Sequence, residues 1–107
     1  MKLWVDDIRP TPAGYMGFRT VNEVKQAIID YEIMYNVSGG KFYYKIELID
    51  LDHDAGVYVT EGGDYIEILN WLEETGRNYP IRIHSMNPVG RENMRRIIQR
   101  NGWTEVM

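Results

Sequence analysis

Leu48-Ile49-Asp50-Leu51-Asp52-His53-Asp54 decides the fold, because a short apolar run passes directly into a polar cluster. The same transition occurs twice more: Leu3-Trp4-Val5 precedes Asp6-Asp7, and Ile81-Arg82-Ile83 precedes His84-Ser85-Met86-Asn87-Pro88. All strand C-termini of a parallel sheet meet at one edge, and open α/β sheets bind ligands there. The three segments therefore predict one crevice that holds four carboxylates and both histidines of the chain.

Helical patterns lie between these strands. Thr20 and Glu23 match a capping box, and apolar residues at helical spacing predict a helix that runs to about Tyr35. Asp64 is expected to cap a second helix, which Gly76 ends. A third helix is predicted after Asn87-Pro88-Val89-Gly90, with Asn101-Gly102 as its stop, whereas the prolines and glycine in residues 9–14 predict a loop.

Five stretches read as strands: Met1 to Val5, Tyr15 to Arg19, Phe42 to Leu51, Ile81 to Ile83 and Trp103 to Val106. Strands that alternate with helical patterns favour a parallel sheet with helices packed on it. Glu47 and Asp50 fit the third strand poorly, since central parallel strands are usually apolar on both faces. We therefore expect one face of the sheet to be less covered than the other.

Length and composition predict one domain over residues 1–107. The chain is 44% hydrophobic and 26% charged, which is an ordinary globular balance. It has no cysteine, and this excludes a disulfide framework, a thiolate zinc site and a cysteine nucleophile. No signal peptide and no apolar run of about 18 residues are visible, so we expect a cytoplasmic protein that binds no membrane. A net charge of −4 argues against binding of long duplex nucleic acid.

The acidic residues after the first and third strands are candidate ligands of a hard cation, because Mg²⁺ prefers carboxylate oxygens. These candidates are Asp6, Asp7, Asp52 and Asp54. Strand alternation places Asp52 and Asp54 on one side and His53 on the other, unless a turn brings His53 back. The alternative is that these aspartates only form the turns that end each strand.

The cluster after the fourth strand suits phosphate chemistry. His84 is either a general acid or base, or a partly buried histidine that bonds a backbone carbonyl. Free N–H groups at a helix start bind phosphate well, and Arg91 adds a charged, bidentate donor there. Ser85, Asn87 and Arg91 therefore look like an oxyanion or phosphate cradle.

The pattern resembles the receiver domains of two-component signalling. Those domains have an acidic pair after strand one, an aspartate after strand three and a serine or threonine after strand four, matched here by Asp6-Asp7, Asp52 and Ser85. The resemblance implies a single three-layer, flavodoxin-like α/β domain with a five-stranded parallel sheet in the order 2-1-3-4-5. Three main helices are expected, because the first and last receiver helices and the lysine after strand five are missing from this sequence.

The closer resemblance is to the cyclic-phosphate processing receiver-like domains. Three motifs carry it: Val5-Asp6-Asp7-Ile8-Arg9-Pro10, Leu51-Asp52-His53-Asp54, and the run from His84 through Pro88 to Asn93. The resemblance implies metal-dependent hydrolysis, with Mg²⁺ or Mn²⁺, of cyclic phosphate ends of RNA or nucleotides. The residues then expected in catalysis are Asp52, His53, His84 and Ser85, and those expected to bind substrate are Arg9, Asn87, Arg91 and Asn93.

The implied partner is a phosphate-bearing small molecule or an RNA end. Two routes stay open from the sequence: Asp52 holds the metal, or it attacks the phosphate and forms an aspartyl phosphate. The alternative function is a signalling module that accepts phosphate at Asp52 or binds a phosphorylated ligand without hydrolysing it.

Overall fold

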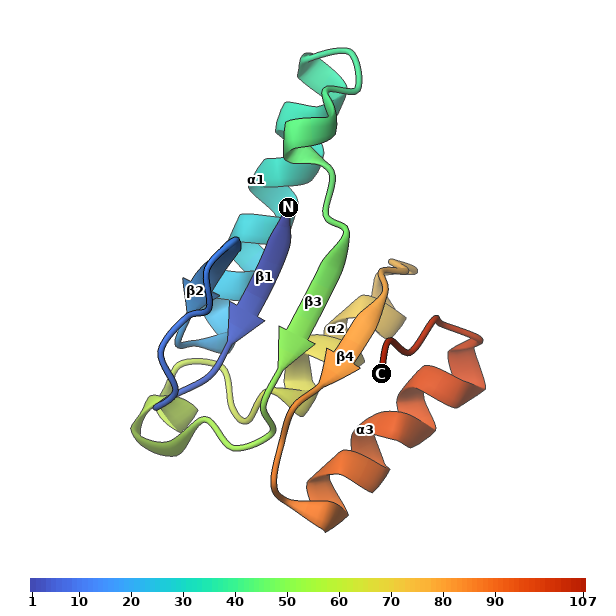
Figure 1. The fold of residues 1–107 in the computed structure, drawn as a ribbon. Coiled ribbons are helices and arrows are strands. Elements are labelled where there is room, and N and C mark those ends of the chain that lie inside the picture. The colour runs from blue at the N-terminus through green and yellow to red at the C-terminus, as the bar shows by residue number, and fades with distance from the viewer.

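Four short parallel strands form the sheet of the computed structural model, which describes residues 1–107 (Figure 1). The strands are β1 (Lys2–Val5), β2 (Tyr15–Phe18), β3 (Leu48–Leu51) and β4 (Ile81–Ile83), in the order β2-β1-β3-β4. The helices are α1 (Val21–Val37), α2 (Ile66–Glu74) and α3 (Pro88–Asn101). The predicted α/β class, the parallel pairing and the order of the first four strands are confirmed.

Side-chain caps set the starts of two helices. Thr20 Oγ1 accepts a hydrogen bond from the Glu23 N–H at 3.0 Å, and Glu23 Oε1 accepts from the Thr20 N–H at 3.1 Å, so the predicted capping box is present. Asn87 Oδ1 caps α3 through the Gly90 N–H at 3.0 Å. The expectation that Asp64 caps α2 is wrong, because its Oδ1 accepts instead from the Ala55 N–H at 2.8 Å and so ties down the loop after β3.

The third predicted strand is shorter than expected. Residues Phe42–Tyr44 form a 3-10 helix, η1, and β3 begins only at Leu48. The N–H groups of Tyr44 and Lys45 donate to carbonyls three residues back, and the Tyr44 ring lies 6.5 Å from the Tyr31 ring of α1. The aromatic content of these residues favoured a strand, but packing against α1 stabilises the 3-10 helix instead.

The predicted fifth strand is also wrong. Residues 103–106 pair with β4 through one isolated bridge, between Ile81 and Glu105. Two hydrogen bonds flank it, from the Ile81 N–H to Thr104 O at 3.0 Å and from the Val106 N–H to Ile81 O at 2.7 Å. Because β4 itself has three residues, it offers this segment little length to pair with, and the sheet has four strands.

All three helices pack on one face of the sheet. The core joins alternate strand residues such as Leu3, Ile49 and Ile81 to the apolar faces of α1, α2 and α3 in a single cluster of 19 buried residues. The opposite face, called the second face below, carries the other alternate residues, such as Trp4, Asp50 and Arg82. The expectation of three layers is therefore wrong, because the sheet and the helices form two. The expectation that one face of the sheet is less covered is confirmed.

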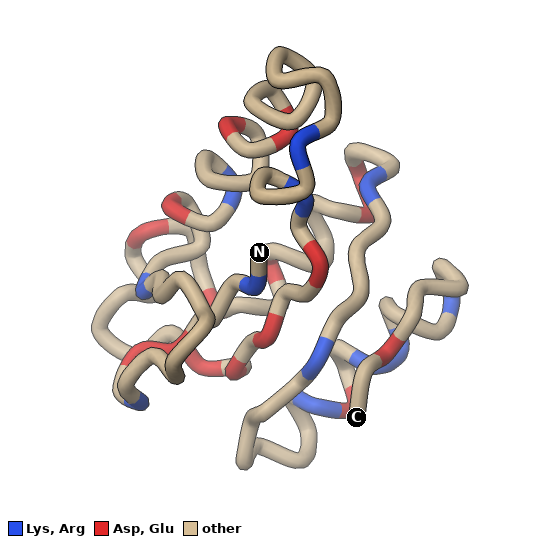
Figure 2. Tube along the Cα trace, turned by 45° about the horizontal axis from the view of Figure 1, so that its top comes forward, with Lys and Arg blue, Asp and Glu red and all other residues tan.

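A loop takes the place of helices on the second face. Figure 1 shows the segment between β1 and β2 in front of the sheet and α1 and α2 behind it. Thr11 of this loop lies directly against Gly17, which pairs with Trp4, so the loop packs over the second face at β2. Figure 2 shows basic residues, all of them Arg, recurring along α3, while acidic residues dominate around α1, β1 and β3. None of the helices has the length and hydropathy needed to cross a membrane.

Replacing Thr20 by alanine should lower the free energy of unfolding by about 1 kcal/mol, because the Glu23 N–H loses its acceptor. Urea denaturation followed by circular dichroism measures this. Thr60→Ala is the matched control, since Thr60 is exposed and caps no helix. Equal effects of the two substitutions would contradict the role of the capping box.

Candidate functional site

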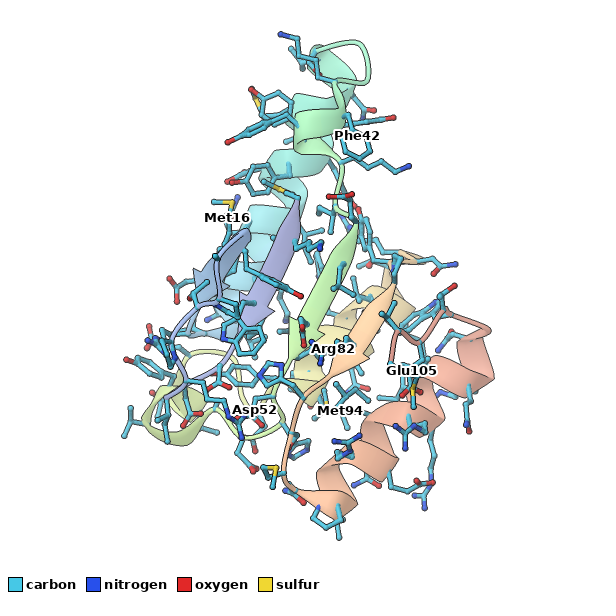
Figure 3. All side chains as sticks on the ribbon, viewed as in Figure 1. Met16, Phe42, Asp52, Arg82, Met94 and Glu105 are labelled. Carbon is cyan, nitrogen blue, oxygen red and sulfur yellow. The ribbon has the colours of Figure 1, made fainter.

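Three aspartates meet at the C-terminal edge of the sheet. Asp6 and Asp7 follow β1 and Asp52 follows β3, and each offers a carboxylate oxygen within 4.8 Å of the others. These three residues are called the acidic cluster. Figure 3 shows Asp52 below the strand ends and Arg82 on the second face, which is turned toward the viewer. Parallel pairing of β1 with β3 produces this convergence, because it sets Val5 opposite Leu51.

Asp6 is the anchored member of the acidic cluster. Its Oδ1 accepts from the N–H groups of Ile8 at 2.8 Å and Arg9 at 2.7 Å, and its Oδ2 accepts from His84 Nε2 at 2.9 Å and Arg9 Nη1 at 3.2 Å. Burial alone would raise the pKa of Asp6, but these hydrogen bonds lower it below the usual value. Asp6 is thus a buried, ionised carboxylate with a fixed direction.

Asp7 has the opposite environment. Burial raises its pKa, and repulsion from Asp52, Asp6 and Asp54 raises it further, while only its own backbone N–H acts in the other direction. Gly56, at a φ of 57°, lies directly against the Asp7 carboxylate, where a Cβ would collide with Oδ2. Asp7 therefore carries a negative charge with no positive group beside it.

Arg9 supplies the positive charge of the acidic cluster. Its Nη1 lies 3.2 Å from Asp6 Oδ2, 3.7 Å from Asp52 Oδ2 and 3.4 Å from His84 O. Asp52 is itself oriented by the His53 N–H, which donates to its Oδ1 at 2.7 Å. The Arg9 side chain is 42% exposed, so it lies over the acidic cluster from the solvent side.

Both ring nitrogens of His84 face carboxylates. Nδ1 lies 2.7 Å from Asp50 Oδ1, and Nε2 lies 2.9 Å from Asp6 Oδ2. The ring also stacks on Trp4, with centroids 3.9 Å apart and planes 2° from parallel. One interpretation of the sequence gave a partly buried His84 a backbone carbonyl as its partner. In the structure its partners are two carboxylates. Asp50 and Trp4 were also missed as neighbours of the site, although the poor fit of Asp50 to a central strand was the available signal.

His53 has one free ring nitrogen. Its Nδ1 lies 2.9 Å from Asp54 Oδ1, and hydrogen bonds from His53 and then Asn87 lower the pKa of Asp54. The ring packs against Gly90 of α3, where any Cβ would collide with it. Nε2 of His53 has no hydrogen-bond partner. It reaches solvent, because Trp4 Nε1 is the one side-chain nitrogen or oxygen that is both buried and unpartnered.

The residues after β4 mainly bond to one another. The Ser85 side chain is buried and its Oγ accepts from the Asn87 N–H at 3.1 Å, while Arg91 Nη1 donates to Ser85 O at 2.9 Å. Pro88 has no N–H, and the Gly90 N–H is already used by Asn87, which leaves the start of α3 few donors for a phosphate. Asn93 accepts from Arg96 on α3 at 3.3 Å, and its side chain forms no hydrogen bond with the other candidate residues.

No cavity lies at the acidic cluster, where Asp6 is buried and Asp7 and Asp52 are partly exposed. A cavity of about 430 Å³ lies at the opposite edge of the sheet beside Ile46 and Pro80, and one of about 310 Å³ lies beside Lys2 and Tyr15. Exposed aliphatic side chains occur instead in the loops around the acidic cluster, where Ile8, Val57 and Met86 are each about 80% exposed or more. Asp7 and Asp52 are therefore the members of the acidic cluster that solvent reaches.

The parallel sheet with acidic residues at its C-terminal edge makes this a receiver-like domain. A family model described as "cyclic-phosphate processing receiver domain" matches residues 1–100. The chain belongs to this family, and the resemblance stated from its motifs is confirmed. No curated protein and no solved structure matches the chain.

Replacing Asp7 by asparagine should stabilise the metal-free protein at neutral pH by about 0.2–1 kcal/mol, because it removes repulsion between partly exposed carboxylates. The folded-state pKa of Asp7 lies above its usual value, so ionisation destabilises the folded state as pH rises through that interval. The gain should therefore vanish at acidic pH. Urea denaturation at several pH values tests this, with Glu61→Gln as control because Glu61 is an exposed carboxylate in the neighbouring loop. A loss of stability in Asp7→Asn at neutral pH would contradict the assignment.

Proposed function

We propose that this domain hydrolyses cyclic phosphate ends of RNA or nucleotides with the help of a divalent cation, Mg²⁺ or Mn²⁺. The observation that carries the proposal is the uncompensated negative charge of Asp7 within the acidic cluster. Membership of a cyclic-phosphate processing family supports the substrate class. The partial exposure of Asp7 and Asp52 supports access of a terminal phosphate.

The acidic cluster fits a hard cation, because three carboxylate oxygens lie within 4.8 Å of one another. Asp7 and Asp52 would hold the ion, and Oδ2 of Asp6 would join them when Arg9 moves away to the phosphate, whereas Oδ1 of Asp6 is already filled by two backbone N–H groups. Asp54 is proposed to orient His53 rather than to hold the ion. When bound, the ion supplies Lewis-acid polarisation of a phosphoryl group.

His53 is proposed as the proton-transfer residue. Hydrolysis of a cyclic phosphate forms one P–O bond to water and breaks one P–O bond to the ribose, so a proton leaves the water and another reaches the departing oxygen. Asp54 holds Nδ1 of His53, and the exposed Nε2 is free to exchange protons. His84 is less suited, because both of its nitrogens already face carboxylates.

Arg9 is proposed to hold phosphate oxygens. Its half-exposed guanidinium already lies over the acidic cluster, and guanidinium matches phosphate through two parallel hydrogen bonds. Arg91 and Asn87 would shape the neighbouring surface, since both are engaged with residues after β3 or β4. Ser85 is proposed to support the loop through its buried hydroxyl, and Asn93 lies outside this arrangement.

The proposal is tested by incubating the protein with Mn²⁺ and nucleoside 2′,3′-cyclic phosphates and following the monophosphate product by chromatography. His53→Gln should lower the rate by about 100-fold or more, because general acid–base catalysis is lost. Glu61→Gln should leave the rate unchanged.

Absence of turnover with any cyclic end, while calorimetry shows bound Mn²⁺, would refute the proposed enzymatic activity. The alternative, a phosphoacceptor at Asp52, would then be favoured if acetyl phosphate added one phosphate that Asp52→Asn failed to accept.

A further inference from the structure

A fully buried carboxylate lies in the middle of β3, on the second face. Asp50 Oδ1 lies 2.7 Å from His84 Nδ1, and Asp50 Oδ2 accepts from Arg82 Nη1 at 3.2 Å and Tyr15 OH at 3.3 Å. A buried charge is costly unless it is paired and hydrogen-bonded, and here three donors meet that requirement. None of the functions considered above gives Asp50 a role.

Asp50, His84 and Asp6 form a continuous buried chain that joins the second face to the acidic cluster. Asp6 is ionised and can only accept, so Nε2 of His84 donates to it. Asp50 accepts from the Arg82 guanidinium through Oδ2, and its Oδ1 lies 2.7 Å from Nδ1 of the same ring. Stacking on Trp4 fixes the plane of the ring, and the two carboxylates fix its rotation within that plane.

We propose that Asp50 is a positioning residue for the acidic cluster: it holds the His84 ring, and the ring holds Oδ2 of Asp6 in its direction. The inference rests on the proposed function in one respect, that the acidic cluster holds the divalent cation. Backbone N–H groups fix only Oδ1 of Asp6, so the direction of Oδ2 depends on His84 and on the partly exposed Arg9 side chain.

A purely structural explanation makes a different prediction. If Asp50 served only as the ion-pair partner of Arg82, then removing either member of that pair would affect the acidic cluster alike. Arg82 forms a hydrogen bond and an ion pair with Asp50 and neither with His84 or Asp6, and its side chain is 42% exposed. Arg82→Gln is therefore a matched control that removes the ion pair and keeps the chain from Asp50 to Asp6.

The first measurement is Mn²⁺ affinity by calorimetry. Losing a residue that orients a group at a metal site typically weakens binding by about 10- to 100-fold, and we expect this for Asp50→Val. Asp50→Asn, which keeps an acceptor for Nδ1, should rescue part of the affinity, and Arg82→Gln should leave it unchanged. Equal losses in Asp50→Asn and Arg82→Gln would overturn the proposal.

The second measurement needs no metal and separates this inference from the proposed function. In nitrogen-15 NMR spectra at fixed pH, wild type should show a slowly exchanging hydrogen on Nε2 of His84. Asp50→Asn, which is the less disruptive variant, should make the Nε2 hydrogen exchange faster, because its contact with Asp6 loosens. An unchanged Nε2 hydrogen would overturn the role of Asp50 even if Mn²⁺ binds, whereas faster exchange in a protein that binds no Mn²⁺ would refute only the metal site.

Discussion

A histidine held between two buried carboxylates is the interaction on which the rest of this structure depends. His84 follows β4, Asp50 lies in β3 and Asp6 follows β1, so two hydrogen bonds tie three strands together at the edge where function is expected. Removing one partner of such a buried pair typically costs about 3–5 kcal/mol, because the other charge is left without compensation. The geometry of the strand ends is therefore rigid where it meets Asp6.

Rigidity at Asp6 contrasts with unrelieved repulsion at Asp7. The two neighbours follow the same strand, yet hydrogen bonds lower the pKa of one while burial and like charges raise the pKa of the other. A folded protein retains such repulsion where function needs it, since a bound cation would relieve it. Arg9 lies over the same carboxylates with an exposed guanidinium, and it can turn to a phosphate once a cation has taken its place.

The sequence was sufficient for the features that depend on local chemistry. Abrupt changes from apolar to polar residues located the strand ends, and the capping box of Thr20 and Glu23 located the start of α1. The start of α3 was placed too late, because the helix begins at Pro88, inside the run that was predicted to precede it. The sequence was not sufficient where packing between distant segments determines the structure. Phe42–Tyr44 turn toward α1, and residues 103–106 meet a strand that is too short to pair with them over their length. A loop rather than helices covers the second face. The partners of His84 lie 34 and 78 residues away, so no local pattern could assign them.

The most direct test of the account is a crystal structure with Mn²⁺ and a nucleoside 2′-monophosphate or 3′-monophosphate, in which anomalous scattering locates the ion. The account predicts Mn²⁺ on Asp7 and Asp52, with the phosphate between the ion, Arg9 and the exposed nitrogen of His53. An ion bound elsewhere, or a nucleotide seated in the cavity beside Ile46 and Pro80 at the opposite edge of the sheet, would contradict it.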